Sequence, residues 1–502
     1  MGIYLSDNEL TQVEPAENAF RSPVPTQIVS NGEFNPLPQT RQQQQVEARI
    51  KELADRHGAK QGLDRREFLR TSCGMAAAFA AMNSVFGNLF EVSEAEAADP
   101  AQAAERAEQL QGQFIFDDQT HFVHDKYSKE ELLGLAVFAA ENWNPALTQE
   151  EQTDLYAYKF ENYVRQIFLN SDTSIALLSG APFDDKAWEF LSNQAIREAV
   201  NIVNRVAGSP RMLGHALVTP GQPGWLDEVD KALEETRPES WKLYTIGDPL
   251  SAKTKYPWRL DDEKLVYPFY EKAVQAGIRT LCIHKGLMPA DYEQSWANVW
   301  QYNTAWDIGK AAKDWPQLNF IIYHGCLRAF QESPDALLDT FDKTGEIQWA
   351  SDLAQIPEQY GVSNVYAEMG TSFANSCTAN PQFAAALLGT WIKGLGADHV
   401  VWGTDSVLYG SPQWQIEALR RLEIPEEMQK KHGFAPLGEA TSTVKNQIFG
   451  FNSARLYNIN LRADYRPLSR DTFAQIKQDY RTAGILDTLR DNATHGFIAK
   501  RA

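Results

Sequence analysis

The sequence predicts an α/β fold in which eight parallel strands close into a (β/α)8 TIM barrel. From about residue 112 onward, short β-branched or aromatic runs alternate with longer segments that can form helices. Eight such units in succession favour a closed parallel barrel over an open, doubly wound sheet. No G-x-G-x-x-G or P-loop pattern follows any of the runs, which argues against a nucleotide-binding sheet. The expected strands are Phe114–His121, Ser174–Leu178, Met212–Val218, Trp241–Ile246, Thr280–His284, Phe320–His324, Val365–Met369 and Val400–Thr404.

Composition divides the chain into four segments. Residues 1–63 are rich in Pro, Asn and Gln and have little core-forming pattern, so most of this extension is expected to be disordered, although 41–55 can form a polar helix. Residues 64–97 resemble an export signal, and 112–460 hold the barrel. Residues 461–502 are polar and helix-forming, and are expected to pack across the barrel or a partner subunit.

The signal-like segment has three parts in order. Arg65 and Arg66 precede an apolar run rich in Ala and Gly, and Ala95-Glu96-Ala97 gives an A-x-A cleavage pattern. This order is typical of a twin-arginine signal and predicts a periplasmic or exported protein that uses the twin-arginine machinery. The apolar run is too short and too weakly apolar for a stable membrane span. The alternative is an ordinary amphipathic helix in a cytoplasmic protein, with the signal unused.

Charge and cysteine content narrow the range of partners. The net charge is −19, which argues against nucleic-acid binding, because that function requires basic surfaces. The expected partner is a small-molecule substrate, and a homo-oligomer is compatible with the sequence. The four cysteines are interpreted as buried thiols rather than a disulfide framework.

Four polar residues stand at the ends of strand-like runs: His121, His284, His324 and Asp405. The C-terminal ends of barrel strands converge on one mouth, so side chains that are far apart in the sequence can meet there. Three imidazoles and a carboxylate are typical ligands of a divalent ion that activates water. Zn²⁺ suits this imidazole-rich set, and Mn²⁺ suits a set with more oxygen ligands.

The first of these runs carries a family resemblance. Asp117, Gln119 and His121 alternate along one strand and therefore point the same way. The run resembles the D-x-H-x-H signature of the amidohydrolase superfamily, in particular its branch of 2-amino-3-carboxymuconate semialdehyde decarboxylase-like enzymes. Gln119 replaces the first histidine of the signature, which in this branch is His or Glu. A neutral amide oxygen is a weaker ligand than either.

Other motifs extend the resemblance over about residues 112–460. His284 in LCIHKG, His324 followed by Gly325, and Gly403-Thr404-Asp405 match the family's histidines and aspartate at strand ends five, six and eight. Residues 448–457 are similar to the G-x-N-A-x-R-L-[FY] segment that follows the last strand. The resemblance implies that His121, His284 and Asp405, with Gln119, hold one divalent ion. It also implies that Asp405 takes a proton from bound water and that His324 acts on the substrate.

The leading hypothesis is a metal-dependent hydrolase that directs metal-activated water onto the carbonyl of a small amide, lactone or ester. The first alternative is a metal-dependent nonoxidative decarboxylase of an aromatic or enolisable carboxylic acid, and no residue in the sequence separates the two chemistries. A second alternative, motivated by Gln119, is a catalytically weakened barrel that acts as a binding protein. The candidate substrate-binding residues, chosen because each can hold a carboxylate, are Arg328, Lys242 and Tyr244.

Overall fold

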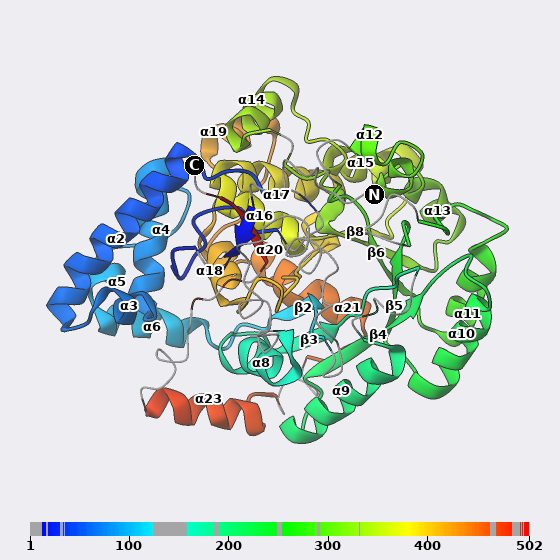
Figure 1. Ribbon diagram of the computed structural model, residues 1–502, viewed down its shortest axis with the longest axis horizontal. Helices are drawn as coiled ribbons and strands as arrows, with labels where there is room; N and C mark the ends of the chain where they lie inside the picture. The colour runs from blue at the N-terminus through cyan, green and yellow to red at the C-terminus, as the bar shows by residue number, and fades with distance from the viewer. Residues whose placement is uncertain are drawn as a thin grey trace.

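The computed structural model confirms the barrel: eight parallel strands follow one another around a single sheet in chain order. Thr120 pairs with Ser406 and the amide of Asp118 donates to the carbonyl of Trp402 at 2.9 Å, so the first and last strands meet and the sheet closes. Figure 1 shows helices arranged around these strands. The strands are β2 (Phe116–Thr120), β3 (Ile175–Leu178), β4 (Met212–Val218), β5 (Ser240–Tyr244), β6 (Thr280–His284), β7 (Asn319–Tyr323), β8 (Val365–Glu368) and β9 (Val400–Val401).

The structure describes the chain except at 1–12, 17–18, 31–33, 35, 124–157, 185–188, 190, 248–253, 289–291, 331, 462–467, 484–491, 493, 495 and 501–502. Within the described residues, no helix is long and apolar enough to cross a membrane. The helices from the barrel region onward are α8 (Phe160–Val164), α9 (Asn193–Ala207), α10 (Trp225–Lys231), α11 (Tyr267–Ala276), α12 (Tyr292–Ser295), α13 (Ile308–Asp314), α14 (Pro334–Thr344), α15 (Ala350–Tyr360), α16 (Gly370–Ala379), α17 (Pro381–Leu395), α18 (Gln413–Arg421), α19 (Glu426–His432), α20 (Thr443–Asn446), α21 (Asn452–Leu456) and α23 (Thr472–Thr482).

Helix α9 illustrates how the outer helices pack on the sheet. The Ser192 side chain caps its first turn by accepting from the amide of Ala195 at 3.2 Å. Its buried residues recur at helical spacing and face β4. A Cβ at Gly214 of β4 would lie 2.7 Å from Cγ2 of Ile196, so the missing side chain lets the helix approach the strand closely.

A layer of five helices lies beside the barrel, in the blue part of Figure 1. It consists of α2 (Arg41–Gln61), α3 (Arg65–Leu69), α4 (Ser72–Phe86), α5 (Glu94–Ala98) and α6 (Pro100–Leu110). The polar helix expected over 41–55 is therefore present as α2, and it is longer than expected. The apolar run of the signal-like segment is α4, which packs against α2, α5 and α6 and buries most of its side chains.

This N-terminal layer is joined to the barrel by hydrogen bonds and by a buried ion pair. Arg421 of α18 donates to both carboxylate oxygens of Glu96, at 2.5 and 3.0 Å. The amide of Glu91 donates to the carbonyl of Arg421 at 2.8 Å, and the side chain of Gln382 donates to the carbonyl of Phe86 at 2.9 Å. Ala97, the last residue of the A-x-A pattern, is buried. Residues 65–98 are thus an integral part of this fold.

The two ends of the chain also meet. Strand β1 (Val13–Pro15) pairs antiparallel with β10 (Phe497–Ala499). The helical C-terminal extension includes α23, whose N-cap Asp471 accepts from Arg211 at 2.6 Å and so ties this helix to the start of β4. The pairing of β1 with β10 was not expected from the sequence, because both strands are short and lie in polar segments.

Candidate active site at the barrel mouth

All four predicted residues lie at the C-terminal ends of strands. His121 follows β2, His284 ends β6, His324 follows β7 and Asp405 follows β9. Each is at most 4% exposed. Two contacts join them in pairs, His121 with Asp405 and His284 with His324, and the charge of His324 also acts on Asp405.

In the first pair, Nε2 of His121 lies 3.0 Å from Oδ1 of Asp405. Nδ1 of His121 lies 2.8 Å from the carbonyl oxygen of Ser179, which can only accept, so Nδ1 carries a proton. Nε2 is therefore the nitrogen that faces the carboxylate. The side-chain amide of Gln119 donates to the same Asp405 oxygen at 3.0 Å, which brings the third residue of the first-strand motif into the cluster.

Both oxygens of Asp405 accept hydrogen bonds. Oδ1 accepts from the side-chain amide of Gln119, and Oδ2 accepts from the hydroxyl of Thr371 at 2.7 Å. Burial alone would raise the pKa of this carboxyl. The hydrogen bond and charge of His121, followed by the charge of His324 and the Thr371 hydroxyl, instead hold the pKa of Asp405 well below its usual range. Asp405 is therefore an anion, and each of its oxygens accepts a hydrogen bond from a neighbouring side chain.

In the second pair, His284 packs between two rings. Its ring stacks on Tyr244 at a centroid distance of 4.4 Å and meets His324 edge-on at 4.6 Å. The ammonium group of Lys242, which is fully buried, lies 5.1 Å from the centroid of the Tyr244 ring and 3.7 Å from that of Tyr323. Two of the candidate substrate-binding residues, Lys242 and Tyr244, are thus placed beside the histidines.

Arg328, the third candidate, is directed elsewhere. Its guanidinium lies 4.4 Å over the ring of Tyr292 and donates to the side chain of Gln348 at 2.6 Å. Neither partner is one of the four predicted mouth residues, although Arg328 follows His324 by only four positions.

His324 and Asp405 have unusual backbone conformations. Their φ angles are 64° and 57°, in the left-handed region that side-chain-bearing residues rarely adopt. Such a conformation costs about 1–3 kcal/mol and persists where surrounding contacts impose it, which happens most often at functional sites. The two residues predicted to do the chemistry are therefore also held under backbone strain.

Glu368, which the sequence analysis did not single out, holds the strained loop after β7. Its carboxylate accepts from the amide of His324 at 3.0 Å and from the amide of Gly370 at 2.6 Å. Burial raises the pKa of Glu368 well above its usual value. Its position near the end of the expected strand Val365–Met369 could have marked Glu368 as a site residue. No sequence pattern marks Thr371, which lies in the following helix.

Asp117 fixes the segment that carries Asp405. Its carboxylate accepts from the amide and hydroxyl of Thr404 at 3.0 and 2.5 Å, and from the amide of Gln119 at 3.2 Å. Burial raises the pKa of Asp117 to about 7, an effect only partly offset by these hydrogen bonds. The first and last barrel strands are thus joined directly beneath the His121–Asp405 pair.

His121 and Asp405 fit a metal ion, but the predicted His and Asp ligands do not form one group among the described residues. Nε2 of His121 and Oδ1 of Asp405 face each other at 3.0 Å, so both atoms could bind one cation. Oε1 of Gln119 is buried and has no hydrogen-bond partner among the described residues, whereas Nε2 faces Asp405 and His121, so Gln119 could serve as a third ligand only with its amide group turned over. Within the described part of the chain, no three His, Cys, Asp or Glu side chains are grouped to hold a metal. The residues that fit the ion are therefore His121, Asp405 and Gln119, and the role of His284 as a ligand stays a prediction.

Comparison with solved structures gives several matches. A 2,6-dihydroxybenzoate decarboxylase from Rhizobium is 12% identical, covers 69% of this chain and 99% of its own, and has a TM-score of 0.41. A 5-carboxyvanillate decarboxylase from Novosphingobium aromaticivorans DSM 12444, solved with manganese, is 14% identical and covers 70% of this chain and 98% of its own, with a TM-score of 0.41. A 4-oxalomesaconate hydratase from Rhodopseudomonas palustris is 17% identical and covers 74% of this chain and 99% of its own, with a TM-score of 0.39.

A search of curated proteins found no match. The family model described as Amidohydrolase matches residues 119–459, more than half of the chain. This range begins at Gln119 and includes His121, His284, His324 and Asp405. The chain belongs to the amidohydrolase family.

Proposed function

We propose that this protein is a metal-dependent decarboxylase that acts on an aromatic or enolisable carboxylic acid. The observation that carries the proposal is the state of Asp405, whose two oxygens already accept hydrogen bonds from Gln119 and Thr371. This chemistry was the first alternative from the sequence, and the contacts of Asp405 support it over the hydrolase that the sequence favoured.

Hydrolysis requires a carboxylate that takes a proton from the attacking water and later returns it to the leaving group. An aspartate that accepts from Gln119 and Thr371, and that lies 3.0 Å from His121, is a weak base because these partners stabilise its charged form. Decarboxylation needs no attacking water. It requires positive charge to orient the substrate carboxylate, and an acid that delivers a proton to carbon.

The contacts at the barrel mouth support both requirements. A divalent ion bound by His121, Asp405 and Gln119 would supply positive charge that orients the substrate. Lys242 adds a buried cation beside Tyr244 and His284. His324, held by Glu368 through its own amide, lies on the other side of His284 and is the proposed acid.

In the proposed reaction, the bond between the substrate carbon and its carboxylate breaks, and carbon dioxide leaves. The electron pair of that bond stays on the carbon, which then takes a proton from His324. Solvent returns a proton to His324. Each turnover thus consumes one carboxylate and one proton and releases one carbon dioxide and one protonated product.

Hydrolysis stays as a second candidate, because Nε2 of His121 and Oδ1 of Asp405 face each other and could bind one cation. Carbon dioxide release over a panel of hydroxybenzoates, amides and lactones separates the two, with the protein loaded in turn with Mn²⁺ and Zn²⁺. Carbon dioxide with loss of the acid supports the proposal, whereas a new acid or amine without carbon dioxide contradicts it. Lack of any stoichiometric ion in the purified protein would favour the binding-protein alternative instead.

Localisation is a separate proposal. The order of Arg65-Arg66, the apolar run and Ala95-Glu96-Ala97 supports export through the twin-arginine machinery. Burial of Ala97 and the Glu96–Arg421 ion pair support the alternative, in which the segment stays in the folded protein. The N-terminal residue of protein recovered from the producing cell decides between them. A start just after Ala97 means an exported, processed protein, and an intact Met1 means an unused signal.

A further inference from the structure

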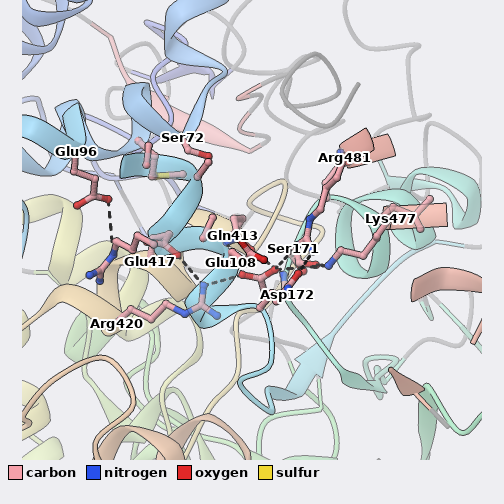
Figure 2. Close-up of a pocket in the computed structure, with 18 of the residues that line it drawn as sticks. Ser72, Glu96, Glu108, Ser171, Asp172, Gln413, Glu417, Arg420, Lys477 and Arg481 are labelled. Carbon is pink, nitrogen blue, oxygen red and sulfur yellow. Dashed lines mark hydrogen bonds and ion pairs between the residues drawn. The ribbon is translucent and has the colours of Figure 1, made fainter. Parts of the chain in front are cut away.

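A charged cavity of about 380 Å³ lies among α4, α6, α18 and α23 and the residues that precede β3. Gln111 and Asp172 of its wall precede β2 and β3, so this wall lies at the end of the barrel where strands begin, whereas the candidate active site lies where strands end. Figure 2 shows Lys477 and Arg481 reaching toward Asp172 from one side and Arg420 from the other. Its charged side chains are Arg106, Arg420, Arg421, Lys477, Arg481, Glu96, Glu108, Asp172 and Glu417.

Two buried arginines already bind three of the carboxylates. Arg420 lies 2.7 Å from Asp172 and 2.8 Å from Glu417. Arg421 lies 2.5 Å from Glu96 and 3.1 Å from Glu417. These five side chains carry two positive and three negative charges, so this network has one negative charge left over.

Three further cations line the cavity, and their ion pairs with Glu96, Asp172 and the exposed Glu91 are long, at 3.7 to 4.0 Å. Nε of Arg106 lies 3.7 Å from the nearest oxygen of Glu96, and its buried Nε and Nη2 atoms have no hydrogen-bond partner in the described part of the chain. The ammonium of Lys477 lies 3.7 Å from Asp172, and the guanidinium of Arg481 lies 3.9 Å from the same carboxylate. The fourth carboxylate, Glu108, is exposed to solvent and is therefore screened.

Burial lowers the pKa of two of these cations. Burial lowers the pKa of Lys477 to about 8, although the charge of Asp172 opposes the effect. Burial and the neighbouring Arg421 also lower the pKa of Arg106. Buried N–H donors without acceptors are costly, and an anion that accepts from them removes the cost.

We propose that this cavity binds a small molecule bearing an oxyanion, either a phosphate group or a pair of carboxylates, through Arg106, Lys477 and Arg481. The cavity volume lies in the range of small-molecule sites. Arg106 belongs to α6, whereas Lys477 and Arg481 belong to α23, so a bound anion would join the N-terminal layer and the C-terminal helix across the side of the barrel. The site would therefore couple ligand binding to the stability of both terminal segments.

Titration of the full-length protein with sodium phosphate and with succinate, at constant ionic strength, tests the site by calorimetry and thermal unfolding. The expected result is saturable binding of at least one probe with a rise in Tm. Tighter binding of phosphate identifies the phosphate class, and tighter binding of succinate identifies the dicarboxylate class.

Variants locate the binding. Arg106→Gln and Arg481→Gln should each weaken the affinity by about tenfold or more, which corresponds to losing one charged hydrogen-bonding partner of about 1.4 kcal/mol. Arg197→Gln is the matched control, because Arg197 lies on α9, pairs with Glu239 and does not line the cavity. Arg481 is one-third exposed, so its variant is expected to fold even where Arg106→Gln does not. Absence of saturable binding, or equal affinity in Arg481→Gln and the unaltered protein, would overturn the proposal.

Discussion

Nε2 of His121 lies 3.0 Å from Oδ1 of Asp405, across the seam where the first and last strands of the barrel meet. This contact depends on closure of the barrel, because the two residues belong to opposite ends of the strand sequence. Gln119 completes the cluster from the same strand as His121, with its amide on Asp405 and its carbonyl oxygen unused among the described residues. This chain therefore has an amide at the position where the related signature has His or Glu.

Replacing Gln119 with glutamate is expected to strengthen metal binding. A carboxylate is a better ligand than a neutral amide, and without a cation it would repel Asp405. Gln119→Glu should raise the affinity for Mn²⁺ by about tenfold or more and should lower the Tm of the metal-free protein. Metal titration followed by thermal unfolding measures both effects. Gln119→Ala is the control and should bind Mn²⁺ more weakly than the unaltered protein; equal affinities in all three proteins would show that residue 119 is not a ligand.

Removing the carboxylate of Glu368 is expected to loosen His324. Glu368→Ala leaves the amides of His324 and Gly370 without their acceptor, which should lower the free energy of unfolding by about 1–3 kcal/mol. Because the strained loop then relaxes, kcat should fall more than KM changes. Glu368→Gln keeps one acceptor oxygen and should recover part of both losses. A Glu368→Ala protein with normal kcat would separate Glu368 from the positioning of His324.

His215 is expected to make the fold sensitive to acid. It is buried in β4, where its Nε2 lies 3.3 Å from the hydroxyl of Tyr323. Burial, together with the charges of Lys242 and His121, lowers the pKa of His215 well below 6.5. Because the unfolded chain binds this proton below pH 6.5 and the folded chain does not, stability should fall as the pH drops below that value. Through this group, the free energy of unfolding should fall by up to about 1.4 kcal/mol for each pH unit.

Chemical unfolding of His215→Gln between pH 5 and 7.5 measures this contribution. The variant keeps a donor for Tyr323 but cannot titrate, so its stability should depend less steeply on pH. His399→Gln is the control, because His399 lies at the other end of the barrel against the carbonyl of Ser363. An unchanged slope in His215→Gln would mean that other groups cause the acid sensitivity.

The N-terminal layer is expected to stabilise the barrel through Glu96. Glu96→Ala leaves the buried Arg421 with Glu417 as its remaining carboxylate partner and should cost about 1–3 kcal/mol of unfolding free energy. Glu105→Ala, at an exposed position on α6, should change stability by less than about 0.5 kcal/mol. If the two variants are equally stable, the Glu96–Arg421 pair does not fasten the layer to the barrel.

The sequence predicted the barrel closely, because each strand is a short apolar run between helix-forming segments. The observed and expected strand ends differ most at β9, where pairing stops at Val401 although the strand was expected to run to Thr404. Beyond Val401, the amides of Thr404 and Asp405 instead donate to Asp117 and Gln119. The mouth residues were predictable from their places at strand ends. Thr371 and the contacts between the mouth residues were not predictable, since they depend on distances between strands that no local pattern records.

The N-terminal layer shows a different limit. An Ala-rich helix preceded by two arginines has the composition of a signal segment and also that of a helix packed among neighbours, and α4 has both features. Only the long-range contacts of Glu96, Phe86 and Arg421 show that it packs on the barrel. The pairing of β1 with β10 is hidden in the sequence for the same reason.

The most direct test of the proposed chemistry is turnover of a carboxyl-labelled hydroxybenzoate in D₂O by the Mn²⁺-loaded protein. Decarboxylation predicts one labelled carbon dioxide per product, and one deuterium on the carbon that carried the carboxylate, with both signals lost in His324→Gln. A product that keeps the labelled carboxylate and has gained the elements of water would contradict decarboxylation and return the site to hydrolysis.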